Sequence, residues 1–71
     1  MEYRNKIIQL LERLDVRARV ALLLDNQFQA GLDALDPDCP CYVWDEAIQG
    51  CIFYGLYYKL QLQDEAMALP A

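Results

Sequence analysis

The side chains best suited to chemistry are two cysteines in a proline-rich, acidic segment. Cys39 and Cys41 flank Pro40 within residues 36–45, DPDCPCYVWD, and Cys51 follows further along the chain. A structural zinc site needs four ligands, usually in spaced pairs, and Cys-Pro-Cys differs from the CxxC of thioredoxin-like redox sites. We therefore predict that the prolines shape a turn and the thiols fill small apolar spaces. A thiol- or metal-dependent protein is the less favoured alternative.

Most of the catalytic repertoire is missing from the sequence. The chain has no histidine, serine or threonine, so it lacks the commonest general base and the hydroxyl nucleophiles. Its three glycines are too scattered for a phosphate-binding loop. The carboxylates occur where solvated helix faces and helix caps would place them. We therefore predict a protein that is not an enzyme and has no cofactor or metal.

The apolar pattern predicts an all-α fold, an antiparallel helical hairpin in a single domain over residues 1–71. One helix is expected over about residues 2–35, a turn over about 36–40, and a second helix over about 41–66 before a frayed tail. Asp15 is a point where the first helix could break, because aspartate caps helices well. The first apolar stripe comprises Ile7, Leu11, Leu14, Ala18, Ala21, Leu24, Phe28, Leu32 and Leu35. The second comprises Trp44, Ile48, Cys51, Gly55, Tyr58 and Leu62.

The amount of apolar surface predicts self-association. Of the 71 residues 56% are hydrophobic, and residues 51–58, CIFYGLYY, carry no charge on any side of the helix. A two-helix hairpin cannot cover such a segment, so we expect two hairpins to pair as a four-helix-bundle homodimer. Small residues spaced four apart on the second helix would let a partner helix approach closely. The expected dimer interface comprises Val16, Val20, Leu23, Ala47, Cys51, Gly55 and Tyr58.

Aromatic and acidic side chains suggest a surface for another protein. We expect Trp44 and Tyr58 in the bundle core or dimer seam, whereas Tyr54 and Tyr57 fit either that seam or a partner-binding surface. The acidic residues around the turn fit either a pole that docks on a basic partner or ordinary capping and solubility. These acidic residues are Asp33, Asp36, Asp38, Asp45 and Glu46.

The basic residues are concentrated in the N-terminal part of a chain whose net charge is −5. Arg13, Arg17 and Arg19 suggest a strip that contacts phosphates, or one that contacts the acidic pole of another protomer. A sequence pI near 4.3 disfavours direct nucleic-acid binding, since such domains are usually strongly basic.

Three features bear on location. No apolar segment reaches the length of about 20 residues that a membrane span needs. The N-terminal residues carry charges throughout, unlike a signal peptide, and the cysteines are three, an odd number. We therefore expect a reduced, cytoplasmic protein without membrane contact.

These features together predict a small, acidic regulator or inhibitor that works by occluding a partner protein. Phage-encoded inhibitors and antitoxin-like regulators are proteins of this general kind, and their partners include nucleic-acid-binding and regulatory proteins. This analogy concerns the class of protein and matches no individual residues. The outline of two helices and a tight turn is similar to plasmid-encoded regulators of the Rop type. That architectural resemblance implies, as the alternative, a nucleic-acid-associated regulator.

Overall fold

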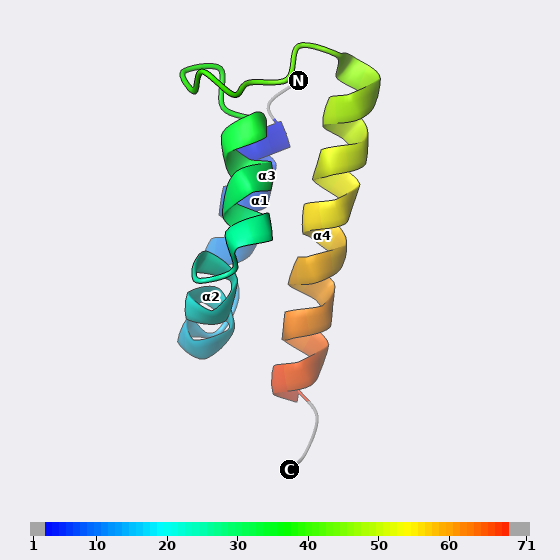
Figure 1. The fold of residues 1–71 in the computed structure, drawn as a ribbon. Helices are drawn as coiled ribbons and strands as arrows, with labels where there is room; N and C mark the ends of the chain where they lie inside the picture. Colours follow the sequence, from blue (N-terminus) through cyan, green and yellow to red (C-terminus); the bar gives the residue numbers. More distant parts are fainter. Residues whose placement is uncertain (1–2, 69–71) are drawn as a thin grey trace.

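The computed structural model describes residues 3–68, and within them the chain is all-α, with no strand. The helices are α1 (Tyr3–Glu12), α2 (Val16–Leu23), α3 (Asn26–Ala34) and α4 (Glu46–Ala68). Figure 1 shows α1 descending from the N-terminus, α2 at the lower end, α3 rising, and α4 descending along the whole length. The elongated molecule measures 42 × 19 × 18 Å along its principal axes.

The segment expected to form one helix over residues 2–35 is divided into three helices. Asp15 caps α2, because its carboxylate accepts a hydrogen bond from the Arg17 backbone N–H over 2.8 Å. Asp25 caps α3 in the same way and accepts from the Gln27 backbone N–H over 2.8 Å. Each carboxylate satisfies an N–H that a helix start leaves without a partner, so each favours a new helix there. We anticipated a break at the first aspartate but not at the second.

The connection to α4 is longer than the turn predicted at residues 36–40. The second helix was expected from about residue 41, but it begins at Glu46. Asp45 sets this start, because its Oδ1 atom accepts hydrogen bonds from the backbone N–H groups of Ala47 and Ile48 over 2.9 and 3.1 Å. As a result α3 and α4 run in opposite directions on either side of the loop (Figure 1).

One hydrophobic core joins the helices, because α1, α2 and α3 all pack against α4. Its buried members are Ile7, Leu11, Leu22, Phe28, Leu32, Leu35, Leu56 and Leu60. Gly31 allows the close approach of α3 to α4: a Cβ atom at this position would lie 2.7 Å from Leu56 Cδ2. The glycine is therefore a packing requirement of this helix pair.

The break between α2 and α3 changes which apolar residues are buried. Leu24, expected in the core stripe, has 77% of its surface exposed, and Ala21 is also exposed. Leu22 is buried instead, with 2% of its surface exposed. Ala18 of the predicted stripe is buried as expected, with 1% of its surface exposed, so the stripe follows the buried side of α2 as far as Ala18 and leaves it at Ala21 and Leu24, just before the break.

Candidate protein-interaction surfaces

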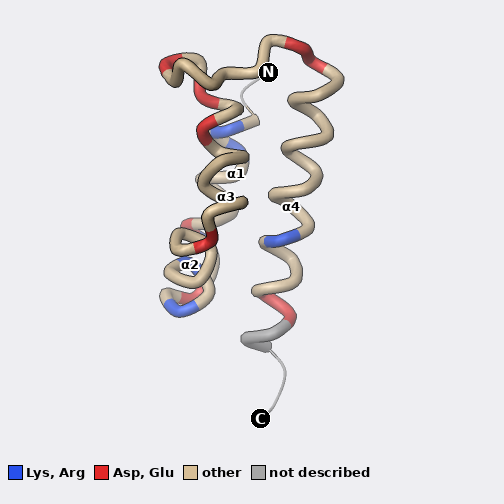
Figure 2. Tube along the Cα trace, viewed as in Figure 1, with Lys and Arg blue, Asp and Glu red and all other residues tan. Residues whose placement is uncertain are grey.

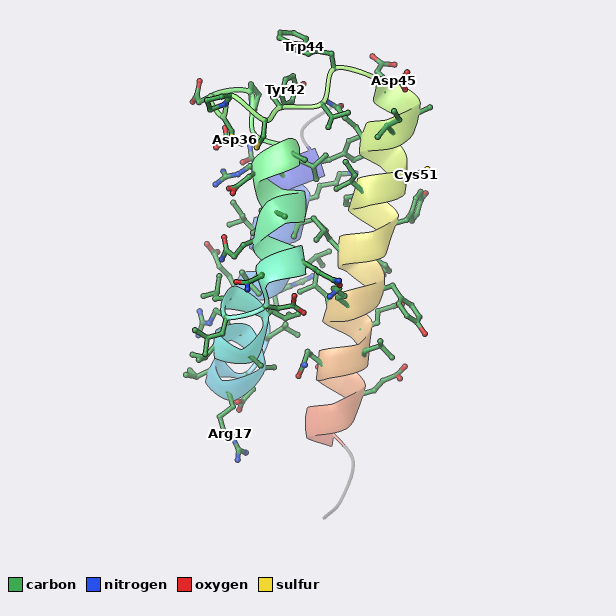
Figure 3. The ribbon with its side chains drawn as sticks, in the orientation of Figure 1. Arg17, Asp36, Tyr42, Trp44, Asp45 and Cys51 are labelled. Carbon is green, nitrogen blue, oxygen red and sulfur yellow. The ribbon has the colours of Figure 1, made fainter. Side chains whose placement is uncertain are left out.

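The side of α4 turned away from the core is an exposed apolar surface, which we call the outer face. Leu56 and Leu60 occupy the buried side of the helix. Lys59, the only charged residue between positions 47 and 63, is hydrogen-bonded to Asp25 and lies off this face. Figure 3 shows Cys51 on the side of α4 away from the other helices. The outer face comprises the exposed residues Ala47, Ile48, Cys51, Tyr54, Gly55, Tyr58 and Leu62.

A ridge of small residues on the outer face is open to solvent. Around Gly55 nothing lies within 4 Å of an added Cβ atom. Gly50 is different, because it is half-buried and its Cβ position lies 3.8 Å from the hydroxyl of Tyr3. Ala47 and Cys51 continue the ridge at helical spacing and are exposed. Another helix can therefore approach this ridge closely, because no part of the described chain occupies the space beside it.

The residues expected to form one dimer interface lie on two separate faces. Ala47, Cys51, Gly55 and Tyr58 share the outer face of α4. The remaining three are exposed on α2, on the side opposite its buried residues, and the core lies between the two helices (Figure 1). These three, with the exposed fractions of their surface, are Val16 at 62%, Val20 at 47% and Leu23 at 41%. A single flat interface therefore does not contain both groups.

A groove between α1 and α4 contains one of the aromatic residues expected to bind a partner. It has a volume of about 770 Å³, and Leu10, Phe53 and Tyr57 form its apolar part. Tyr57 stacks on Phe53 with ring centroids 6.1 Å apart. Lys6 and Arg13 add positive charges to the lining, Glu12 adds a negative charge, and Gln9 adds a neutral amide. Sequence reasoning missed this groove, although Lys6, Leu10 and Arg13 recur at the spacing of one helix face.

The other expected aromatics are also accessible. Tyr54 is 70% exposed on the outer face and meets Phe53 edge-on at 5.4 Å. Trp44 and Tyr58, expected in the bundle core or dimer seam, are 84% and 61% exposed in the single chain. Trp44 packs edge-to-face on Tyr42, with centroids 4.9 Å apart, in the loop before α4. The single-chain core therefore uses neither Trp44 nor Tyr58.

The acidic residues around the loop form two groups with different tasks. Figure 2 shows one group along the end of α3 and the following loop, and another at the start of α4. Asp36 is engaged within the chain, because it accepts the Asp38 backbone N–H over 2.9 Å and lies 3.8 Å from the Arg4 guanidinium. Asp45 caps α4. The side chains of Asp33, Asp38 and Glu46 belong to exposed residues.

The three arginines proposed as a strip lie in different surroundings. Arg13 lines the groove between α1 and α4, whereas Arg17 projects from the lower end of α2 (Figure 3). The side chain of Arg17 is 83% exposed and lies 3.8 Å from the Asp15 carboxylate. Arg19 is half-buried on α2. Because a break separates α1 from α2, these side chains do not follow one helix face.

The two loop cysteines lie in contact with each other. The Sγ atoms of Cys39 and Cys41 are 2.6 Å apart, and Cys41 is exposed, so its thiol does not fill an apolar space as expected. The hydrogen bond with Cys39 raises the pKa of Cys41, and desolvation and the nearby Asp33 carboxylate act in the same direction. Within the described residues no group of three or more side chains is arranged to hold a metal ion.

In the part of the chain that the structure describes, no helix combines the length and apolar character needed to cross a membrane. Comparison with protein-family models, with curated proteins and with solved structures found no match.

Proposed function

We propose that this protein is a non-enzymatic, cytoplasmic regulator that binds another protein and inhibits it by covering its functional surface. The observation that carries the proposal is the groove between α1 and α4, where Tyr57 stacks on Phe53 beside Lys6 and Arg13. Concave sites that combine aromatic side chains with a few polar groups are the usual binding sites of proteins. The absence of histidine, serine and threonine supports the non-enzymatic part of the proposal.

We assign the small-residue ridge of the outer face to a second copy of the chain. Gly55 has open space around its Cβ position, and Ala47 and Cys51 add little bulk. Two such ridges can approach closely in a helix pair, and Tyr58 beside them supplies a large apolar contact. The exposed α2 residues Val16, Val20 and Leu23 lie on another face, so this homodimer does not use them.

The partner protein is assigned to the groove of Tyr57 and to the acidic loop, which the dimer leaves accessible. The groove combines stacked aromatic rings with Lys6 and Arg13, and aromatic and arginine side chains are enriched in binding hot spots. Exposed Asp33 and Asp38 at the loop favour a partner with a basic surface. No observation favours a nucleic acid in its place.

Affinity capture from a lysate of the source cells tests this proposal with two matched variants. The wild-type protein should recover one protein near equal stoichiometry, and Tyr57→Ala should reduce that recovery at least about tenfold, as a hot-spot loss does. Leu24→Ala should leave it unchanged, because Leu24 is exposed at the C-cap of α2, outside the groove. Equal recovery by all three proteins would contradict the assignment of the groove. Salt-sensitive recovery of nucleic acid, lost on joint Arg13→Ala and Arg17→Ala substitution, would favour the Rop-like alternative.

Sedimentation of the purified protein tests the homodimer separately. The wild-type chain should sediment as a dimer, and Gly55→Leu should sediment as a monomer with unchanged helix content, because its side chain would fill the ridge. Val20→Ser on α2 is the control and should remain dimeric. A monomeric wild-type chain at all accessible concentrations would overturn the assignment of the outer face to a second copy.

A further inference from the structure

The loop between α3 and α4 holds two thiols in contact with each other. Cys39 and Cys41 are both free, and their Sγ atoms are 2.6 Å apart. Both sulfur atoms belong to residues with solvent access, since Cys39 is half-buried and Cys41 exposed. A small molecule in solution can therefore reach this pair.

The backbone keeps the two thiols in this position. The Cys39 backbone N–H donates to the Asp36 carbonyl over 3.0 Å, and the Tyr42 N–H donates to the Cys39 carbonyl over 3.0 Å. Pro40, between the two cysteines, has a fixed φ angle and so removes one backbone freedom. Closing a ring across residues 39–41 therefore costs little additional conformational entropy.

We propose that Cys39 and Cys41 are a reversible redox-modification site, at which small-molecule disulfides oxidise the two thiols to a Cys39–Cys41 disulfide. The site is independent of the proposed regulatory function. The contact between Cys39 and Cys41 has a geometry suited to this reaction, because the two sulfur atoms that must bond are already neighbours. A tetrahedral zinc site would need more ligands than the described residues bring together.

The reaction proceeds by two thiol–disulfide exchanges. The thiolate of one cysteine attacks a sulfur of the small disulfide, breaks its S–S bond, and forms a mixed disulfide while one small thiolate leaves and takes up a proton. The second cysteine, as a thiolate, then attacks the protein sulfur of the mixed disulfide and releases the second small thiol. The protein loses two electrons and two protons, and the small disulfide is reduced to two thiols.

Cys51 provides an internal control in the same chain. It lies on the outer face of α4 (Figure 3), away from the loop that carries the other two cysteines. Its thiol can be oxidised by the same small disulfide only as far as a mixed disulfide or a bond between two chains. The proposal therefore requires that Cys51 behave differently from Cys39 and Cys41 under the same conditions.

The test is equilibration of the folded protein in mixtures of reduced and oxidised glutathione, followed by acid quenching, alkylation and mass spectrometry of peptides. Cys39 and Cys41 should lose their alkylatable thiols together, without bound glutathione, while Cys51 remains alkylatable. This should occur at a glutathione mixture at least about tenfold more reducing than the one that modifies Cys51, because the effective concentration of one neighbouring thiol for the other is high.

Single variants make the test decisive. In Cys39→Ala and Cys41→Ala the remaining loop cysteine should carry glutathione and should do so at the same mixture as Cys51. The wild-type chain in denaturing urea should need a more oxidising mixture than the folded chain, because the loop no longer holds the thiols together. Three independent glutathione adducts on the folded wild-type protein, or disulfides only between chains, would overturn the proposal.

Discussion

The Lys59 ammonium group donates a hydrogen bond to the Asp25 carboxylate over 2.8 Å, and this pair joins the middle of α4 to the break between α2 and α3. The same carboxylate accepts the backbone N–H groups of Gln27 and Phe28 and so caps α3. One aspartate therefore fixes both the start of a helix and its attachment to the longest helix. Both side chains are about one-third exposed, so solvent weakens the ion pair itself.

The first prediction concerns the pH dependence of stability. The hydrogen bond from Lys59 and the backbone N–H groups hold the pKa of Asp25 below its ordinary value of 3.8, although desolvation opposes them. The unfolded chain therefore binds a proton at higher pH than the folded chain does. The resulting stabilisation is present above that ordinary value and is lost as the pH falls through the lower, folded-state pKa. Lys59→Met should remove the largest cause of the lowered pKa of Asp25, the hydrogen bond from Lys59.

Urea unfolding followed by circular dichroism measures this effect. The wild-type protein should be more stable than Lys59→Met at about pH 7, and the difference should be smaller at about pH 2.5, below the ordinary pKa of 3.8, because protonation of the carboxylate removes its attraction to Lys59. Asp25→Asn is the control, since adding Lys59→Met to it should change stability much less than in the wild-type chain. A wild-type advantage of the same size at both pH values would contradict the role given to this pair.

The second prediction tests the break between α2 and α3 through two apolar residues. Phe28 is fully buried, so Phe28→Ala should lower the free energy of unfolding by about 3–5 kcal/mol and leave so small a domain largely unfolded. Leu24 belongs to the same stripe in the sequence but is 77% exposed, so Leu24→Ala should change stability by less than about 0.5 kcal/mol. Equilibrium unfolding compares the two. A large loss in Leu24→Ala would indicate one continuous helix.

The helical spacing of apolar residues predicted much of the core correctly but failed at the end of α2, where Ala21 and Leu24 are exposed. Ile7 and Leu11 in α1, Ala18 in α2, and Phe28 and Leu32 in α3 are buried as expected. The break before α3 had a signal in the sequence, since Asp25 is a good cap like the aspartate before α2.

Other features depend on contacts that the sequence does not display. The ion pair of Asp25 and Lys59 spans 34 positions and requires the register of α3 against α4. The groove likewise forms only when α1 and α4 pack together. The all-round apolar character of residues 51–58 predicted a surface that needs a partner, and the structure leaves that surface of α4 exposed. The position of this exposed surface relative to the exposed apolar residues of α2 depends on how the helices pack together, which the sequence pattern does not show.

The third prediction concerns the reactivity of Cys41. Its pKa is raised, first by the hydrogen bond with the Cys39 thiol, so less of its reactive thiolate is present near neutral pH. Cys39→Ala removes this hydrogen bond and should therefore lower the pKa of Cys41 and speed its alkylation by iodoacetamide under reducing conditions. The alkylation rate of Cys51, measured in the same samples by peptide mass spectrometry, should stay constant. An unchanged or slower rate at Cys41 would contradict this account of its pKa.

The fourth prediction compares Gly31, which packs closely against Leu56, with Gly55, which has open space around it. Gly31→Ala gains up to about 1 kcal/mol in helix propensity but places a methyl group 2.7 Å from Leu56 Cδ2. Leu56 is buried, with 4% of its surface exposed, so it has little room to move. Overpacking of this kind costs about 1–3 kcal/mol, and we expect a net loss of stability.

The methyl group added by Gly55→Ala has no neighbour within 4 Å in the single chain. In the monomer the substitution therefore brings only its gain in helix propensity, up to about 1 kcal/mol. Unfolding at low protein concentration, where any dimer has dissociated, should therefore show Gly31→Ala destabilised and Gly55→Ala stabilised. At high concentration the advantage of Gly55→Ala should disappear if a second helix packs against the ridge, because the methyl group then separates the two helices. An advantage that persists at every concentration would place the dimer contact elsewhere, while stabilisation by Gly31→Ala would refute the close contact of α3 with α4.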